Sequence, residues 1–132
     1  MAKPTAREYH TQQVHYLRKT VNFNDVGIAT GVYMGTLPAG AQIVDTVVNV
    51  VTAFNAVSSN VLTVGTNSTS FDDIVAAANV DESSATGQRV TTGLGLELAA
   101  DADVYAKYTQ SGTAASTGQA VIVIAYVPNN DR

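Results

Sequence analysis

The fold class of this chain is decided by the stretch Ile43-Val-Asp-Thr-Val-Val-Asn-Val-Val-Thr-Ala-Phe-Asn55. Apolar side chains fall on one parity of this stretch and polar side chains on the other: Val44, Val48, Val50 and Phe54 against Asp45, Asn49 and Asn55. This alternation predicts a β-strand with one face in a core and the other face in water. Val47 and Val51 interrupt the polar face, so we expect another segment or another subunit to cover part of it.

A second stretch, Ala120–Val127, is apolar at both parities and ends at Pro128. We expect a central strand that is buried on both sides and stops at the proline, which cannot donate to a ladder. Turn residues separate nearly all of the shorter strand candidates, which are Thr20–Asn24, Ile28–Leu37, Val61–Gly65, Gln88–Thr92, Gly95–Leu98 and Asp103–Thr109. About eight short strands without crossover helices predict an all-β fold, an antiparallel β-sandwich or jelly roll.

One short helix is expected near residues 71–78. Ser70 would cap it, and the Asp73 carboxylate would suit the free amides of its first turn. The rest of the chain lacks the long helical periodicity that a parallel sheet requires.

The N-terminal residues allow two interpretations. A capping-box sequence near the start would begin a helix over residues 6–17. The residues from Val14 onward instead alternate into the strand that follows, and we favour this extended arm. We therefore divide the chain into a basic arm, residues 1–19, and a single sandwich domain, residues 20–132.

Composition excludes several classes of protein. A length of 132 residues fits one domain, and 45% hydrophobic against 14% charged residues is too apolar for a disordered chain. The absence of Cys excludes a disulfide scaffold, a thiol nucleophile and a Cys-based metal site. The N-terminus lacks the apolar stretch of a signal peptide, and no apolar run approaches the ~20 residues that span a bilayer, so we expect no membrane partner.

The net charge of −4 is unevenly distributed along the chain. Residues 1–19 contain four cations and one anion, a net charge of +3, whereas the remainder contains three cations and ten anions, a net charge of −7. An acidic body repels phosphate backbones, so nucleic acid is not an expected partner. The basic arm instead suits an acidic protein surface.

No arrangement of residues in the sequence supports catalysis. His10 and His15 are the only histidines, and their spacing of five puts them on opposite faces of an extended arm. Asp101 and Asp103 would share one face of a strand, but no calcium-loop motif surrounds them. We therefore expect no catalytic residue, no cofactor, no metal and no enzymatic activity.

The arm has a composition typical of a protein interface, because interfaces favour tyrosine and arginine. We expect the partner interface to combine residues of the arm with the two valines of the half-wet strand: Arg7, Tyr9, Tyr16, Arg18, Lys19, Val47 and Val51. The alternative is an arm that packs on its own domain.

Six segments within residues 20–127 carry a family resemblance when they are taken in order. They are Gly27-Ile-Ala-Thr-Gly-Val-Tyr-Met-Gly-Thr-Leu-Pro-Ala-Gly-Ala-Gln-Ile-Val-Asp-Thr-Val47, Val51-Thr-Ala-Phe-Asn55, Val61-Leu-Thr-Val-Gly-Thr66, Phe71-Asp-Asp73, Leu98-Ala-Ala-Asp-Ala-Asp-Val-Tyr-Ala106 and Ala120-Val-Ile-Val-Ile-Ala-Tyr-Val127. In this order they resemble the capsid decoration or cement proteins of tailed bacteriophages. The basic arm lies outside the matching region, and the resemblance supplies no catalytic residues.

This resemblance implies a non-enzymatic virion structural protein that is made in the host cytoplasm and binds and stabilises the exterior of the capsid. It implies the major capsid protein as a partner and a homo-oligomer, either a dimer or a trimer. A carbohydrate- or receptor-binding β-sandwich of a phage tail or fibre is the alternative, and it would need an exposed aromatic platform. A small hydrolase or metalloenzyme is a third alternative, which the lack of a reactive cluster disfavours.

Overall fold

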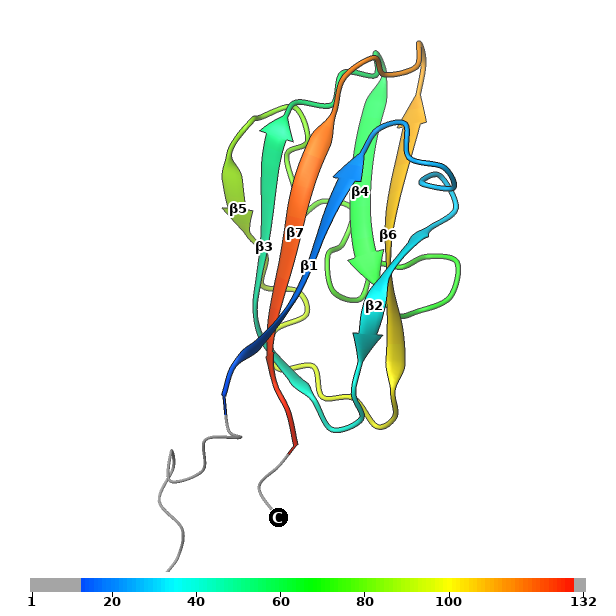
Figure 1. Cartoon of the computed structure of the whole chain (residues 1–132). Coiled ribbons are helices and arrows are strands. Elements are labelled where there is room, and N and C mark those ends of the chain that lie inside the picture. Colours follow the sequence, from blue (N-terminus) through cyan, green and yellow to red (C-terminus); the bar gives the residue numbers. More distant parts are fainter. Residues whose placement is uncertain (1–12, 130–132) are drawn as a thin grey trace, which may run out of the picture.

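The computed structural model describes residues 13–129 as two antiparallel β-sheets packed face to face (Figure 1). The seven strands are β1 (His15–Asn22), β2 (Val32–Leu37), β3 (Gln42–Thr52), β4 (Ser59–Gly65), β5 (Gly87–Arg89), β6 (Ala102–Ser111) and β7 (Gln119–Val127). The first sheet has the order β1-β7-β3-β5 and the second sheet the order β2-β6-β4. Each strand therefore lies in the opposite sheet from the strand before it. The expected all-β sandwich is confirmed.

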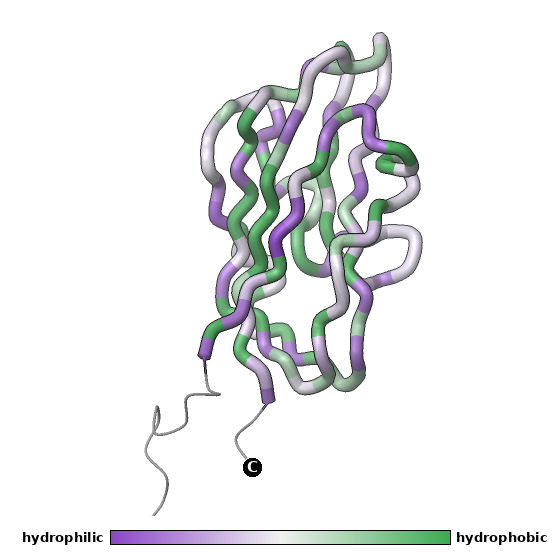
Figure 2. The backbone as a smooth tube through the Cα atoms, in the orientation of Figure 1, coloured by the Kyte–Doolittle hydropathy of each residue, from purple (hydrophilic) through white to green (hydrophobic). Residues whose placement is uncertain are grey.

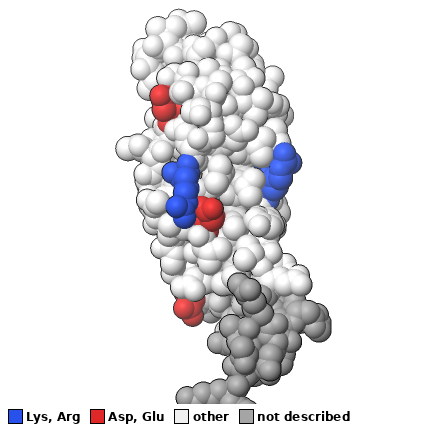
Figure 3. All heavy atoms as spheres, turned by 90° about the vertical axis from the view of Figure 1, so that its left-hand side faces the viewer, with Lys and Arg blue, Asp and Glu red and all other residues white. Residues whose placement is uncertain are grey.

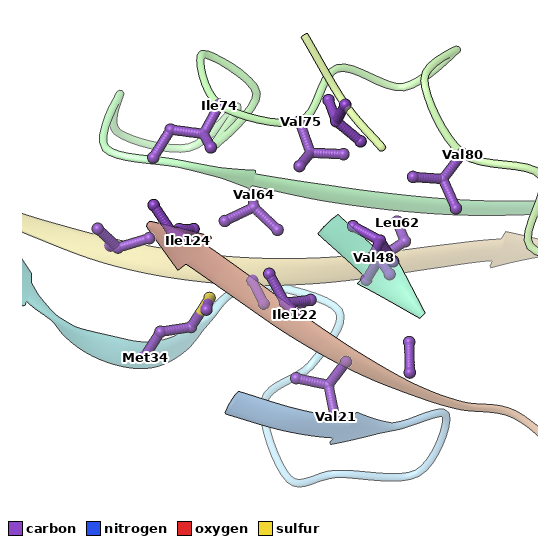
Figure 4. Close-up of a cluster of buried hydrophobic side chains, with 14 of the residues drawn as sticks. Val21, Met34, Val48, Leu62, Val64, Ile74, Val75, Val80, Ile122 and Ile124 are labelled. Carbon is purple, nitrogen blue, oxygen red and sulfur yellow. The ribbon is translucent and has the colours of Figure 1, made fainter. Parts of the chain in front are cut away.

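The core lies between the sheets and follows the two-residue period of the strands. Three cross-strand pairs of β3 and β7 point inward and are at most 1% exposed: Thr46 with Ile124, Val48 with Ile122, and Val50 with Ala120. Figure 4 shows these strands facing Leu62 and Val64 of β4 across the core, and Figure 2 shows the middle of β3 and β7 coloured as hydrophobic. Burying each of the valine and isoleucine side chains contributes about 1.5–3 kcal/mol, so this layer holds the sandwich together.

A β-bulge changes which residues of β3 face the core. The register of β3 with β7 shifts between Ile43 and Asp45. Ile43 is 1% exposed and Val44 is 39% exposed, so the prediction that Val44 lies on the buried face is wrong. The bulge adds one residue to β3 and reverses the parity before it, an effect that the alternation of apolar residues does not reveal.

The predicted helix near residues 71–78 is wrong. Ile74 and Val75 instead run along β4, where both backbone N–H groups donate to the Val64 carbonyl at 3.0 and 2.8 Å and Val64 N–H donates back to the Val75 carbonyl at 3.1 Å. Phe71 has a φ of 45°, outside the helical region. The Asp73 carboxylate accepts hydrogen bonds from Thr66 N and Oγ1 at 2.7 and 2.6 Å, not from helix amides. Burial of the two aliphatic side chains against β4 therefore outweighs the local capping signal.

The expectation of about eight strands is wrong by one among the described residues, which form seven strands. The predicted strand Gly95–Leu98 contributes a single bridge, from Glu97 to Gln42, because Gly95 at a φ of 81° leaves the extended conformation. The predicted strand over residues 28–37 begins at Val32, since residues 27–31 form hydrogen-bonded turns.

The boundary drawn between residues 19 and 20 falls inside β1. His15 pairs with Tyr126 and each following residue of β1 pairs with β7 as far as Asn22, so residues 15–19 are part of the first sheet. Residues 15–17 therefore form a strand and not the end of a helix over residues 6–17. Residues 6–12 of that predicted helix lie outside the described residues.

Replacing Thr46 by valine is expected to stabilise the protein. Thr46 is 0% exposed, and its Oγ1 has no hydrogen-bond partner among residues 13–129. Removing this hydroxyl while keeping the branched shape should raise the free energy of unfolding by about 1 kcal/mol and Tm by roughly 2–5 °C in thermal denaturation. Thr66→Val is the opposing control, because the Thr66 hydroxyl donates to Asp73, and its Tm should fall. A lower Tm for Thr46→Val would contradict the unpaired state of that hydroxyl.

Candidate functional site

The outer side of the first sheet carries the side chains that alternate with those of the core. The register places them in three rows from β1 toward β5: Tyr16–Ala125–Asp45, Arg18–Val123–Val47–Arg89 and Thr20–Val121–Asn49–Gly87. Neighbours within a row lie side by side, with Cβ atoms about 4.5–5.5 Å apart. We call these three rows the valine face, after Val47, Val121 and Val123 at its centre.

The three central valines are only partly buried. Ile122 and Ile124, on the inner side of β7, are 0% exposed. The prediction for Ala120–Val127 is therefore confirmed for its central place, between β1 and β3. Its outer side is not fully buried as predicted, because Ala125 is 7% exposed there but Val121 and Val123 are only partly buried among residues 13–129. Figure 3 views the molecule from the side on which β5 and β3 lie in Figure 1, and it shows a largely uncharged surface with few charged groups, of which one basic and one acidic group lie in contact.

A guanidinium group lies at each end of the middle row. Arg89 Nε donates to Asp45 Oδ1 at 2.9 Å, the only ion pair among residues 13–129. This hydrogen bond from Arg89 lowers the pKa of the Asp45 carboxyl. Arg18, at the other end, is exposed and forms no such pair within the described residues. The row thus joins an apolar centre to a basic rim.

The structure brings together three of the residues predicted for the partner interface. Tyr16, which is 67% exposed, Arg18 and Val47 all lie on the valine face. Lys19 is paired with the inward-facing Ile122. Its side chain therefore projects from the inner side of β1, opposite to Tyr16, Arg18 and Val47. Val51 sits in a second bulge at the end of β3 and is 47% exposed.

Two further residues of that prediction, Arg7 and Tyr9, lie outside the described residues. The prediction also lacked Val121, Val123 and Arg89. The signal for the two valines was present in the sequence, since Ala120–Val127 is apolar at both parities. Only the pairing of β5 with β3 brings Arg89 beside Val47.

A hollow of ≈ 580 Å³ lies at one end of the sandwich and is lined by residues 53–60 and 81–83. Glu82 is 6% exposed there, and its Oε1 accepts a hydrogen bond from Leu62 N at 2.7 Å. Burial raises the pKa of the Glu82 carboxyl. Because Leu62 belongs to the edge strand β4, Glu82 satisfies a backbone donor that would otherwise be free to pair with another chain.

Replacing Glu82 by glutamine is expected to raise Tm at pH 7. The amide oxygen can still accept the Leu62 hydrogen bond, while the buried charge is gone. The raised pKa means that the wild-type protein gains stability from Glu82 at low pH and loses it as the pH rises through the folded-state pKa. The Tm difference between Glu82→Gln and wild type should therefore shrink as thermal scans move from about pH 7 to about pH 4. A variant less stable than wild type at pH 7 would contradict this account.

The described residues hold no cluster of three or more His, Asp or Glu side chains placed to bind a metal. Asp101 Oδ1 accepts a hydrogen bond from Ala39 N at 2.8 Å, and Asp103 Oδ1 accepts one from Thr36 Oγ1 at 2.7 Å. His10 lies outside the described residues, and the ring of His15 stacks on Tyr126. Among residues 13–129 there is also no helix that is long and apolar enough to cross a membrane.

Three aromatic rings gather on the outer side of the second sheet. Tyr105 of β6 is 4.8 Å from Phe71 and 5.7 Å from Tyr33, measured between ring centroids. A Cβ at Gly31 would overlap the Phe71 ring, so that ring is enclosed between Gly31 and Tyr105. Tyr33 is 50% exposed. The cluster anchors the loop after β4 and leaves one ring half open to solvent.

No protein-family profile and no curated protein matches the sequence. The fold is similar to chains of three solved phage capsid structures. The cyanophage Pam1 capsid asymmetric unit gives a TM-score of 0.72 and 19% identity over 97% of this chain and 92% of that chain. The acidic stable capsid of Helicobacter pylori bacteriophage KHP30 gives 0.65 and 20% over 89% of each chain. The capsid of Ralstonia phage GP4 gives 0.61 and 17% over 98% of this chain and 92% of that chain.

Proposed function

We propose that this chain is a non-enzymatic structural protein of a phage virion, and specifically a decoration or cement protein that binds the capsid exterior and stabilises it. The observation that carries the proposal is the match over nearly the full length of both chains to a chain of the cyanophage Pam1 capsid, with a TM-score of 0.72. At sequence identities of 17–20%, these matches support a shared fold. We infer the capsid role from the fact that all three matched chains come from phage capsid structures.

Two features of the fold support this role. The strand orders β1-β7-β3-β5 and β2-β6-β4, with every connection crossing between sheets, favour the jelly-roll form of the sandwich, an architecture common in viral capsids. The described surface offers an apolar sheet face with a basic rim rather than a pocket of reactive groups. Such a block suits binding to a large protein surface.

The finer parts of the proposal concern the partners. The major capsid protein is the proposed partner, and a dimer or trimer of this chain is the proposed form on the capsid. Residues of the arm, Arg7 and Tyr9 among them, would extend the contact beyond the sandwich. Lys19 and Val51 remain candidates for contacts between copies, since both lie away from the three rows of the valine face.

The proposal is tested with virions whose genome encodes this chain. Mass spectrometry of purified particles should find the protein in stoichiometric copies, and image reconstruction should place it on the capsid exterior. Capsids assembled without it should bind the purified protein in sedimentation and then withstand a higher temperature. Absence of the protein from purified particles would overturn the proposal.

A carbohydrate- or receptor-binding module of a tail or fibre is the second candidate, because Tyr33 and Tyr105 form a partly exposed aromatic pair on the second sheet. A glycan-array screen distinguishes the two functions. Clear hits that are lost in Tyr33→Ala, together with no binding to capsids, would favour this candidate.

A further inference from the structure

We infer that the valine face is the surface by which this protein docks, and that its partner is a capsid protein presenting an apolar strip with a carboxylate opposite Arg18. The inference rests on the proposed function and names the face and the chemistry of the contact. It follows from the side chains at the centre of the face, the charges at its rim and the symmetry of the middle row.

The centre of the face is more apolar than a solvated sheet surface requires. Threonine has nearly the same shape as valine and is equally suited to a strand, and the chain contains it at many positions, including Thr20 at the edge of this face. Val47, Val121 and Val123 are nevertheless all valine and only partly buried. Covering such a surface with another apolar surface removes it from water, which favours association.

The charges of the face differ from those of the rest of the described chain. Residues 13–129 contain four basic and nine acidic side chains. Two of the basic ones, Arg18 and Arg89, lie in the middle row, and Asp45 is the only acidic side chain in the three rows. Asp45 already pairs with Arg89, which leaves the Arg18 guanidinium available to a carboxylate of a partner.

The symmetry of the middle row disfavours a second copy as the occupant. If two valine faces met about a two-fold axis along the strands through this row, β1 would lie over β5 and Arg18 over the other copy's Arg89. About an axis perpendicular to the strands, each strand would lie over itself and Arg18 over Arg18. The second arrangement brings like charges together. The first offers Arg18 only a guanidinium that already pairs with Asp45, the one acidic side chain of the face, so a different surface with a free carboxylate opposite Arg18 fits better.

The test compares matched variants on the two sheets. Val47→Thr combined with Val123→Thr removes the apolar centre at constant shape, and Arg18→Glu reverses the free charge. Val61→Thr on β4 and Lys107→Glu on β6 make one change of each kind on the outer side of the second sheet, where these residues pair with Thr109 and Thr63. Lys107→Glu also removes the hydrogen bond from Lys107 Nζ to Thr69 O at 3.0 Å, so its binding is compared with that of Arg18→Glu only alongside its Tm. Each full-length variant is measured for affinity to capsids assembled without the protein, for Tm, and for oligomeric state by analytical ultracentrifugation.

Both valine-face variants should bind capsids at least about tenfold more weakly than wild type, with Tm within a few degrees of wild type, and both controls should bind normally. Added salt should weaken wild-type binding more than binding by Arg18→Glu.

Wild-type affinity in both valine-face variants would overturn the inference and leave the proposed function intact. Failure of the wild-type protein to bind capsids would overturn the proposed function as well. Dissociation of a wild-type dimer by these substitutions would identify a second copy as the occupant and also overturn the inference.

Discussion

Replacing Phe54 by alanine is expected to lower the free energy of unfolding by about 3–5 kcal/mol. Phe54 is 2% exposed and follows the end of β3, where its ring packs against Tyr108 of β6 with 4.7 Å between centroids. Tyr108 is itself 1% exposed, and its hydroxyl donates to Asn60 Oδ1 at 2.6 Å. The ring thus joins the two sheets at one end of the sandwich, and its removal leaves a cavity that these fixed neighbours cannot fill.

Chemical denaturation with a circular dichroism readout measures this loss, and Tm should fall by roughly 10–20 °C. Gly118 provides a double-mutant cycle, because a Cβ there would overlap the Phe54 ring. Gly118→Ala alone should be strongly destabilising through this overlap and through its φ of 150°, which favours glycine. In the Phe54→Ala background the overlap is absent, so the double variant should lose less than the sum of the single variants. Strict additivity would contradict the contact between these two residues.

Deleting residues 2–19 is expected to abolish cooperative folding, whereas deleting residues 2–12 should preserve it. The longer deletion removes His15–Lys19 from β1, including Leu17, which packs against the core opposite Ile124. It also leaves residues 122–126 of β7, the most apolar strand, as an unprotected edge that can pair with other chains. The shorter deletion spares every residue of the described core, all of which lie within residues 13–129.

Thermal unfolding and size-exclusion chromatography distinguish the two deletions. The protein lacking residues 2–19 should aggregate or show no sharp transition, and the protein lacking residues 2–12 should keep a Tm within a few degrees of wild type. The shorter deletion also tests the arm without disturbing the sheet, and we expect it to weaken capsid binding. A wild-type Tm after the longer deletion would show that the pairing of β1 with β7 is dispensable.

The fold class could be predicted from the sequence because alternation is a local property of the chain. Ile43–Asn55 and Ala120–Val127 contain the inward-facing residues of β3 and β7, and turn residues mark most strand ends. The bulge at Val44 and the missing helix near residues 71–78 were not predictable in this way, because each depends on what packs against the segment. Val75 is extended rather than helical because it pairs with Val64, and no local pattern in the sequence indicates that these two residues pair.

The candidate interface was predictable only in part, for the same reason. Val47 could be recognised as an apolar residue on a polar parity, and Tyr16 and Arg18 as residue types that interfaces favour. Their assembly into one surface needs β1 beside β7, β7 beside β3 and β3 beside β5. None of these three pairs is consecutive in the chain.

By itself, the sequence determined that this chain forms short antiparallel strands with a valine-rich core, lacks thiol chemistry and carries apolar residues on both sides of its last strand. Only the tertiary structure decided which of those sides is covered and which residues border the open one. The physical reason is that hydrophobic periodicity is encoded within a strand, whereas strand order and register arise from contacts between residues far apart along the chain. A row such as Arg18–Val123–Val47–Arg89 therefore exists only once the sheet has formed.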